Sequence, residues 1–435
     1  MNKSFKKWSV VCFVSVILVF CFHHFISKKI AFVTYSNGYF RIQDYAYHII
    51  LVKAFWSDGF GNIYDLYFQQ QALSAHVGSQ INTVMPLGIT PLALVVWFPF
   101  TYVARFSMAL SYTFWVVFSI GVLFTALYKI GRYVFLKKKL QALPITLSLI
   151  TIFSSIMFRT LYLGQTSVLA AGLFVHLIFI CYKPANLPKS AFNLLIPLLI
   201  FVLGMKPTYI ALGLGLLIIN GLWQEAFYSV AFVTVVLIGV TPLLTVKWVS
   251  SYINLLRMYS QGDITYVYDW AIKPHTMNIF RSAFRNFIGD NIAVLISNVV
   301  TYGVYIGIMG FSFLTQIRGK QTDQLIPLIV TKGQLFVLLV ASYLLFTPYA
   351  GVYEDLLFLP IFVMVLLVGN SPPLTSYKNL ALVFFLFVIL LHNYFPPNKP
   401  LWLFWTLKAM ILGYMFYFCR FKERTECTNW RINCT

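Results

Sequence analysis

The chain has 435 residues, of which 60% are hydrophobic, 18% aromatic and only 10% charged. Soluble domains carry roughly 25% charged residues, so this composition excludes a soluble globular protein. It predicts an all-α polytopic membrane protein, because helices satisfy their backbone polar groups within the bilayer. The net charge of +20 is typical of cationic loops that set membrane orientation and contact anionic lipids, and we expect no nucleic-acid partner.

The N-terminus carries three lysines ahead of an apolar run from Ser9 to about Ile26. A cleaved signal peptide is the competing interpretation. The run is long for that purpose and lacks a small-x-small exit. We therefore expect a retained first helix with a cytoplasmic N-terminus.

Membrane-spanning helices need about 20 predominantly apolar residues. The candidate segments are approximately 9–27, 85–104, 107–128, 143–162, 165–182, 191–205, 208–223, 226–246, 291–316, 327–347, 354–369, 379–392 and 400–419. Loops rich in Lys and Arg predict which ends are cytoplasmic. They require an odd number of crossings between residue 85 and Lys137, so one segment there is expected to be short or re-entrant. We expect one integral membrane domain, residues 1–435, with about 12 spans.

Two loops on the predicted outer side are long enough to fold. In the first, residues 28–84, helical spacing is shown by Tyr45, Ile49, Val52 and Trp56. The run at 59–62, Gly-Phe-Gly-Asn, breaks this helix from a looser second one. We expect both helices to lie on the membrane surface. The second loop, residues 247–290, is rich in Tyr and Trp and carries cations, which suits a membrane interface.

Asp44 is the first candidate for chemistry. The chain has only 12 Asp and Glu residues, and this one lies just after the first long apolar segment, where a membrane helix opens onto water. A carboxylate at that place is a candidate for chemistry at the membrane surface. The alternative is that Asp44 merely caps a surface helix.

Two further motifs on the predicted outer side stand at the starts of apolar helices. Lys206-Pro207 places a cation where it could neutralise a phosphate, beside the free N–H groups of the following helix; a snorkelling lysine is the alternative. Gln165, after Gly164, offers both a donor and an acceptor to a sugar hydroxyl. The alternative is an ordinary helix start that is capped by the hydroxyl of Thr166 or Ser167.

The remaining candidates are charged or aromatic residues at predicted outer membrane edges. Tyr353, Glu354 and Asp355 open a late apolar helix, where acids also suit the helix dipole without any catalytic role. Arg41 and Arg281 lie in the two outer loops. Charges at membrane depth are rare and are usually functional or paired.

Other chemistries lack their motifs in this sequence. The seven histidines form no H-x-x-x-H or H-E-x-x-H pair, so no metal site is expected. There is no phosphate-binding G-x-x-x-x-G-K-[ST] loop and no G-x-S-x-G nucleophile elbow. The six cysteines indicate neither a zinc site nor a disulfide framework.

The order of these motifs resembles glycosyltransferase family 87, the polyprenyl-phosphate-dependent mannosyltransferases of the GT-C fold. The similar stretches are Asp44-Tyr45-Ala46-Tyr47, Ala54 to Gly61, Ile63-Tyr64-Asp65, Met85-Pro86 to Pro91, Gly164-Gln165, Gly204-Met205-Lys206-Pro207, and Thr347-Pro348 to Asp355 with the apolar helix past Leu359-Pro360. Together they cover most of residues 40–370. Family members often carry a histidine where this chain has the stretch 353–355, which is a departure.

The resemblance implies an inverting hexosyltransferase, mannose being the implied sugar, with its site on the outer face of a bacterial cell membrane. Asp44 would be the general base. The donor would be a polyprenyl-phosphate sugar, with no other cofactor, and the acceptor a lipid or glycan. We expect Lys206, with Arg41 or Arg281, to steady the donor phosphate. The sugar or acceptor pocket is expected to be shaped by Gln165, Tyr353, Glu354, Asp355 and Tyr45.

Two other classes of protein fit part of the sequence. A transporter or flippase of lipid-linked sugars would share the spans and the outer polar residues. Transporters often show internal repeats with broken helices at mid-membrane, and no such repeat is found here. A structural or assembly protein of the membrane is the third possibility, and in it Asp44 has no chemical role.

Overall fold

The computed structural model describes most of the chain. The described residues are 33–36, 39–57, 61–79, 88–138, 157, 160–161, 164–182, 189–261, 279–317, 332–347, 352–368 and 401–418. Every predicted apolar segment that falls on them contains a helix. Segments 9–27 and 379–392, and most of 143–162, lie outside the described residues.

The described part of the loop 28–84 contains two strands and two helices, which are β1 (Val33–Ser36), β2 (Tyr39–Ile42), α2 (Asp44–Ser57) and α3 (Leu66–Val77). The strands form an antiparallel hairpin in which Val33 pairs with Ile42. The sequence analysis expected only helices in this loop, and the hairpin is therefore a correction. Two paired strands of four residues each are too short to show a clear alternation of apolar and polar side chains.

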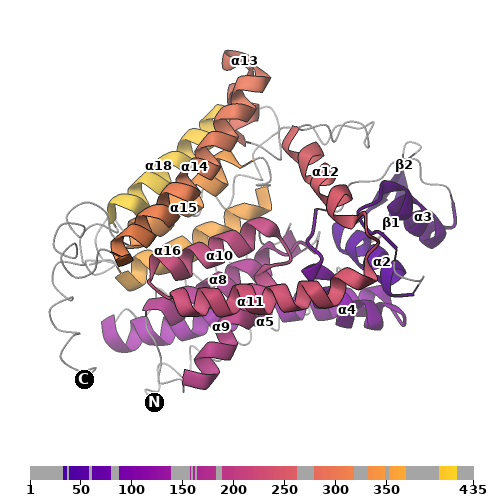
Figure 1. The fold of residues 1–435 in the computed structure, drawn as a ribbon, viewed down its shortest axis with the longest axis horizontal. Helices are drawn as coiled ribbons and strands as arrows, with labels where there is room; N and C mark the ends of the chain where they lie inside the picture. The colour runs from indigo at the N-terminus through magenta and orange to yellow at the C-terminus, as the bar shows by residue number, and fades with distance from the viewer. Residues whose placement is uncertain are drawn as a thin grey trace.

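The rest of the described chain is an apolar helical bundle. Its first part consists of α4 (Leu92–Ala104), α5 (Met108–Lys138), α8 (Ser167–Tyr182), α9 (Lys189–Leu203), α10 (Pro207–Ile219) and α11 (Trp223–Val240). Its second part consists of η1 (Thr241–Leu243), α12 (Trp248–Gln261), α13 (Ile279–Ile288), α14 (Asp290–Ile317), α15 (Lys332–Phe346), η6 (Val352–Leu357), α16 (Phe358–Val368) and α18 (Leu401–Phe418). Figure 1 shows α14, α15 and α18 running together, at an angle to α5, α8 and α11.

Among the described residues, three helical stretches are long and apolar enough to cross a membrane: Met108–Ile130, Trp223–Leu243 and Asp290–Leu314. The chain is thus a helical protein with membrane-spanning character. Several apolar helices are shorter. One is α4, whose 13 residues extend about 20 Å at 1.5 Å per residue, less than the roughly 30 Å of a hydrocarbon core.

Helix α8 lies at the centre of the bundle, in contact with α5, α16 and η6. Nearly all its side chains are buried, as expected for a helix that is apolar on every side. Gly172 allows the closest approach, because a Cβ atom there would lie 2.8 Å from the Cα of Leu123 on α5. This central helix begins just after Gln165, so its N-terminal end fixes the place of a predicted site residue.

Helix α2 packs into the protein instead of lying free on a membrane surface. Most of its side chains are buried, and the Trp56 indole donates to the Leu94 carbonyl of α4 at 3.2 Å. The Tyr47 hydroxyl donates to Gln69 on α3 at 2.8 Å, and the Gln69 amide donates to the Ile63 carbonyl at 2.7 Å. The helix that begins at Asp44 is therefore held rigidly against the bundle.

Helix α12, in the first part of the loop 247–290, lies at the same end of the molecule as the loop 28–84. Figure 1 shows the β-hairpin, α2, α3 and α12 gathered there. Asn62 donates from its amide to the Ser251 hydroxyl of α12 at 2.9 Å. The Tyr64 ring contacts the Trp248 and Tyr252 rings, with centroid distances of 6.2 Å and 4.8 Å. These contacts join the first loop to α12, whereas the membrane side of both loops stays a prediction.

Gly164 supports a test of this packing. Its φ of +70° is disfavoured for other residues, and an added Cβ would lie 2.4 Å from the Tyr45 Cβ. Gly221, with a φ of +77°, has nothing within 4 Å and is the matched control. We predict that G221A lowers the free energy of unfolding by about 1 kcal/mol, the cost of a left-handed alanine. G164A should lower the free energy of unfolding clearly more than G221A does, as measured by thermal unfolding in detergent. Equal losses in the two variants would contradict the close packing of Gly164 on Tyr45.

Candidate functional site

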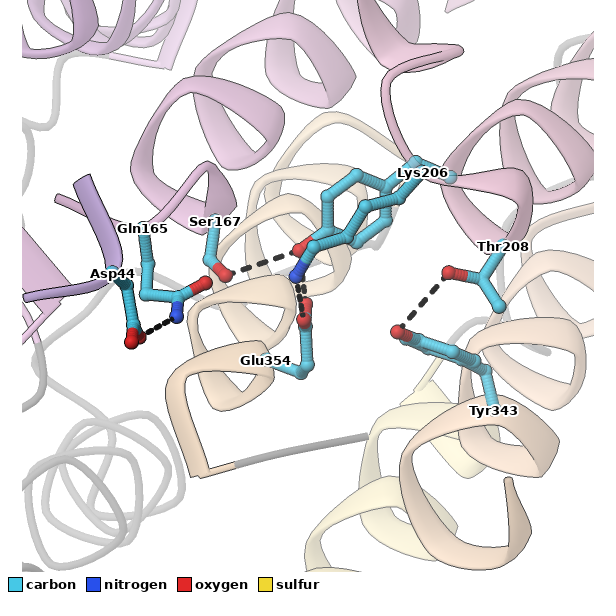
Figure 2. A network of polar contacts seen from close by, with 8 residues as sticks. Asp44, Gln165, Ser167, Lys206, Thr208, Tyr343 and Glu354 are labelled. Carbon is cyan, nitrogen blue, oxygen red and sulfur yellow. Dashed lines mark hydrogen bonds and ion pairs between the residues drawn. The ribbon is translucent and has the colours of Figure 1, made fainter. Parts of the chain in front are cut away.

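The first part of the site joins Asp44 to Gln165. Asp44 is the first residue of α2, where a carboxylate is favoured by the helix dipole. Its side chain is half-buried, and its Oδ2 accepts a hydrogen bond from the Gln165 amide. Figure 2 shows the two side chains end to end. Two residues singled out from distant parts of the sequence are therefore in direct contact.

The turn before α8 sets the position of Gln165. The Gln165 N–H donates to the Thr160 carbonyl at 2.9 Å, and the Trp115 indole donates to the Gly164 carbonyl at 3.1 Å. The expected helix caps are not formed. The buried Thr166 hydroxyl has no hydrogen-bond partner, and the Ser167 hydroxyl lies 3.0 Å from the hydroxyl of Tyr209. The alternative of an ordinary capped helix start is thus wrong.

The second part of the site is an ion pair between Lys206 and Glu354. The Lys206 Nζ lies 2.8 Å from the Glu354 Oε1, and the two side chains are 21% and 1% exposed. The Tyr209 hydroxyl donates to the other carboxylate oxygen of Glu354. The same Nζ lies 5.2 Å from the centroid of the Tyr209 ring. Glu354 is therefore a nearly fully buried carboxylate held by one cation and one phenol.

Lys206 is fixed by the turn that precedes α10. It has an extended backbone, with φ −119° and ψ 134°, and Pro207 follows it in the first turn of the helix. The Thr90 N–H donates to the Met205 carbonyl at 3.0 Å, and the Thr90 hydroxyl donates to the Gly204 carbonyl. The segment before α4 thus clamps the turn that carries the lysine.

The two parts form one polar cluster, which we define as Asp44, His48, Gln165, Ser167, Lys206, Tyr209 and Glu354. Gln165 and Ser167 belong to the same turn and link the halves, since one contacts Asp44 and the other Tyr209. Figure 2 shows Gln165 and Ser167 between Asp44 on one side and Lys206 with Glu354 on the other. The cluster combines a half-buried carboxylate, an accessible cation and several hydrogen-bond donors.

Two predicted pocket residues have other partners. Asp355 is 1% exposed and lies 2.5 Å from the Nζ of Lys408 on α18, although it directly follows Glu354. Tyr45 is fully buried, and its hydroxyl lies 2.5 Å from the Ser111 hydroxyl of α5. Both side chains are buried in the packing of the protein, which corrects the expectation that they line the pocket.

Three predicted residues are placed only by their backbones. Arg41 lies on β2, two residues after Tyr39 and three before Asp44, and Tyr353 lies in η6 next to Glu354. Arg281 lies on α13, which packs on α14, α15 and α18; Figure 1 shows α13 well separated from α2. Their side chains lie outside the described residues, so their expected roles stay predictions.

The sequence analysis missed three members of the cluster as functional residues: His48, Ser167 and Tyr209. Helical spacing could have found two of them, since residues three or four positions apart share a face. His48 follows Asp44 by one turn of α2, and Tyr209 follows Lys206 by three positions. Nothing in the sequence indicates that Ser167 faces Tyr209, because that contact joins two different helices.

His48 contacts the backbone of Asp44 and is close enough to Lys206 to feel its charge. Its Nδ1 lies 2.6 Å from the Asp44 carbonyl oxygen, and its ring stacks on Trp97. Burial lowers the pKa of His48 from 6.5 to about 4; the hydrogen bond to Asp44 opposes this shift and the charge of Lys206 adds to it. The imidazole is therefore neutral at physiological pH.

Comparisons with known proteins add no relative. No protein-family model matches the chain, and no curated protein matches it. The function is therefore inferred from the polar cluster and from the order of motifs along the chain.

The Lys206–Glu354 pair predicts an asymmetric response to substitution. K206M leaves a buried carboxylate without its cation, and such losses cost about 3 kcal/mol or more. E354Q leaves a lysine that is 21% exposed and should cost clearly less. The double variant K206M/E354Q should regain most of what K206M loses, because no uncompensated charge is then buried. Thermal unfolding of the three variants measures this, and additive losses would rule out a direct pair.

The lowered pKa of His48 predicts a loss of stability in acid. The unfolded chain binds the proton near pH 6.5, whereas the folded chain binds it only near pH 4. Stability linked to His48 is therefore fully present above about pH 6.5 and is lost as the pH falls towards about 4. When the pH is lowered from about 7 to about 5, the unfolding temperature of the wild type should fall by more than that of H48F. Identical pH profiles would show that the folded state does not disfavour the charged imidazole.

Proposed function

We propose that this chain is an integral membrane glycosyltransferase of the GT-C type, similar to glycosyltransferase family 87. It would move a hexose, mannose by the resemblance, from a polyprenyl phosphate to a lipid or glycan acceptor. The observation that carries the proposal is that Asp44 and Lys206 belong to one polar cluster, in which the turn of Gln165 and Ser167 links them. They come from the first outer loop and from the turn before α10, and Gln165 and Glu354 hold them there.

The chemistry needs one base and one cation. Asp44 takes the proton from the acceptor hydroxyl as the hydroxyl oxygen attacks the anomeric carbon. The bond from that carbon to the phosphate oxygen breaks, and polyprenyl phosphate leaves with the bonding electrons. Phosphate is a good leaving group, so stabilisation by a cation suffices and no general acid is required. Attack from the side opposite the phosphate inverts the anomeric configuration.

The Lys206–Glu354 pair suits a lysine that holds a phosphate. An ammonium group has three N–H donors, and Glu354 takes one of them. Lys206 is 21% exposed while Glu354 is 1% exposed, so the remaining donors are on the accessible side of the pair. Glu354 thereby keeps the flexible lysine side chain in one position. After transfer, the released phosphate carries more negative charge, and the same ammonium stabilises it.

The proposed topology has about 12 spans, with the cluster on the outer side of a bacterial cell membrane. Contacts between the loops 28–84 and 247–290 support their common side. Helix α4 is our choice for the segment that does not cross fully, because it is short, contains Pro99 and packs against α2. The donor would then reach the cluster from the membrane plane.

One observation favours a transporter of lipid-linked sugars as the second candidate. Lys408 lies well inside the apolar helix α18 and is 3% exposed, paired with Asp355. Buried charges within apolar helices are frequent on transport pathways. Product chemistry separates the two functions, because a transporter leaves the bond between sugar and phosphate intact.

The proposed base predicts the outcome of one substitution. D44N removes the proton acceptor with little change in shape, and Gln165 can still donate to the amide oxygen. We expect transfer from radiolabelled polyprenyl-phospho-mannose to a membrane lipid extract to fall at least about 100-fold.

The matched control is D65N, in the same outer loop. Asp65 is exposed and accepts a hydrogen bond from the Tyr67 N–H as the N-cap of α3, a role that asparagine fills equally well. D65N should keep full activity, and both variants should unfold at the wild-type temperature. Near-normal turnover by D44N would refute the assignment of the base, and absence of any labelled product from the wild type would refute the transferase.

A further inference from the structure

We propose that His48 contacts the transferred sugar, its Nε2 accepting a hydrogen bond from a hydroxyl group of the hexose ring. This inference rests on the proposed function, because that function requires the hexose ring to lie between the base Asp44 and the phosphate-binding Lys206. His48 would then be a specificity-determining residue that the motif order along the chain does not indicate.

The hydrogen bond to Asp44 decides which ring nitrogen can accept. The His48 Nδ1 lies 2.6 Å from a backbone carbonyl oxygen, and a carbonyl can only accept a hydrogen bond. The proton of the neutral imidazole is therefore on Nδ1, and Nε2 carries a lone pair. Within the described part of the chain, no hydrogen bond reaches Nε2, and His48 is not among the fully buried residues.

Stacking holds the plane of the imidazole. The His48 and Trp97 rings are almost parallel, at an interplanar angle of 4° and a centroid distance of 5.6 Å. Trp97 is itself fully buried and stacks on Trp115 at 4.1 Å. An acceptor whose direction is fixed before the substrate arrives loses little entropy on binding. This rigidity suits recognition of one hydroxyl better than proton transfer along a moving chain.

The position of His48 identifies the part of the substrate that it would meet. Asp44 lies one turn before it on α2, and the charge of Lys206 acts on the imidazole. In an inverting displacement the acceptor hydroxyl and the leaving phosphate lie on opposite sides of the anomeric carbon. A residue that contacts the base and feels the charge of the cation is therefore placed to meet the sugar ring, whose remaining polar groups are hydroxyls.

The electrostatic surroundings keep this acceptor available. The charged residues that act on His48 are Asp44 on its own helix and Lys206 before α10, and Lys206 is itself paired with Glu354 on η6. Trp97, from α4, contributes no charge. The neutral state of the imidazole at physiological pH leaves the Nε2 lone pair free to accept from a hydroxyl. A protonated ring would instead donate from both nitrogens and would repel Lys206.

A binding cycle between protein and sugar tests the proposal without requiring turnover. The D44N protein is titrated with polyprenyl-phospho-mannose and with its singly deoxygenated analogues, each lacking one hydroxyl. The same titrations are made with three double variants, each of which combines D44N with a second substitution. H48F keeps the stacked aromatic ring, H48Q keeps a hydrogen-bond acceptor, and H76F is made at a different histidine. His76 is exposed on α3 of the same loop and is the matched control.

We expect H48F to weaken binding of the parent donor about 10-fold, the usual effect of losing one hydrogen bond. In the D44N protein, one deoxygenated analogue should bind about 10-fold more weakly than the parent donor. In the D44N/H48F protein, the same analogue and the parent donor should bind equally well. H48Q should restore part of the affinity, and H76F should change nothing. A merely structural His48 would weaken all analogues alike.

The outcomes separate this inference from the proposed function. If every analogue loses the same factor with and without H48F, no hydroxyl is coupled to His48 and the inference is overturned. If the coupling is present but the wild type transfers no sugar, His48 is upheld as a sugar contact while the transferase is refuted. If D44N, with the wild-type unfolding temperature, binds no donor, both proposals are overturned.

Discussion

A buried carboxylate imposes the arrangement of this site. Glu354 is 1% exposed, and an ionised carboxylate at such depth needs a cation and further donors. Lys206 supplies the cation and Tyr209 a hydroxyl. These contacts join η6 to α10, and Ser167 extends them to the start of α8. The turn that carries Ser167 also carries Gln165, which contacts Asp44 on α2. The contacts that neutralise this acid thus join η6 to α10, and the turn before α8 connects them to α2.

The same network gives the proposed catalytic groups a rigid support. Helix α2 packs against α3 and α4, so Asp44 does not depend on the position of a free loop. The turn of Lys206 is clamped by Thr90. Rigid placement of a base and a cation is what a displacement at an anomeric carbon requires, because the reacting atoms must be aligned before the barrier is reached. An apolar bundle that presents its polar groups at helix ends suits the proposed reaction with a lipid-linked donor.

Most of the helices and several of the site residues could be predicted from the sequence, because charged and polar residues are rare in such an apolar chain. The apolar segments located the helices, the scarcity of charge singled out Asp44, Lys206 and Glu354, and the glycine before a helix start singled out Gln165. Their partners could not be predicted, since the pairs are 121 and 148 positions apart in sequence. Neighbours in sequence also diverge: Glu354 meets Lys206 whereas Asp355 meets Lys408 on α18, because consecutive residues of a helical turn point in different directions. The short β-hairpin had no clear pattern to predict it.

The most direct measurement is a cryo-electron microscopy structure of the D44N protein with bound polyprenyl-phospho-mannose. We expect the phosphate to lie beside Lys206 and the hexose ring to lie between Lys206 and residue 44. The anomeric carbon should turn the face opposite its phosphate towards residue 44. A donor bound with its phosphate away from Lys206, or with its sugar outside the polar cluster, would contradict the account.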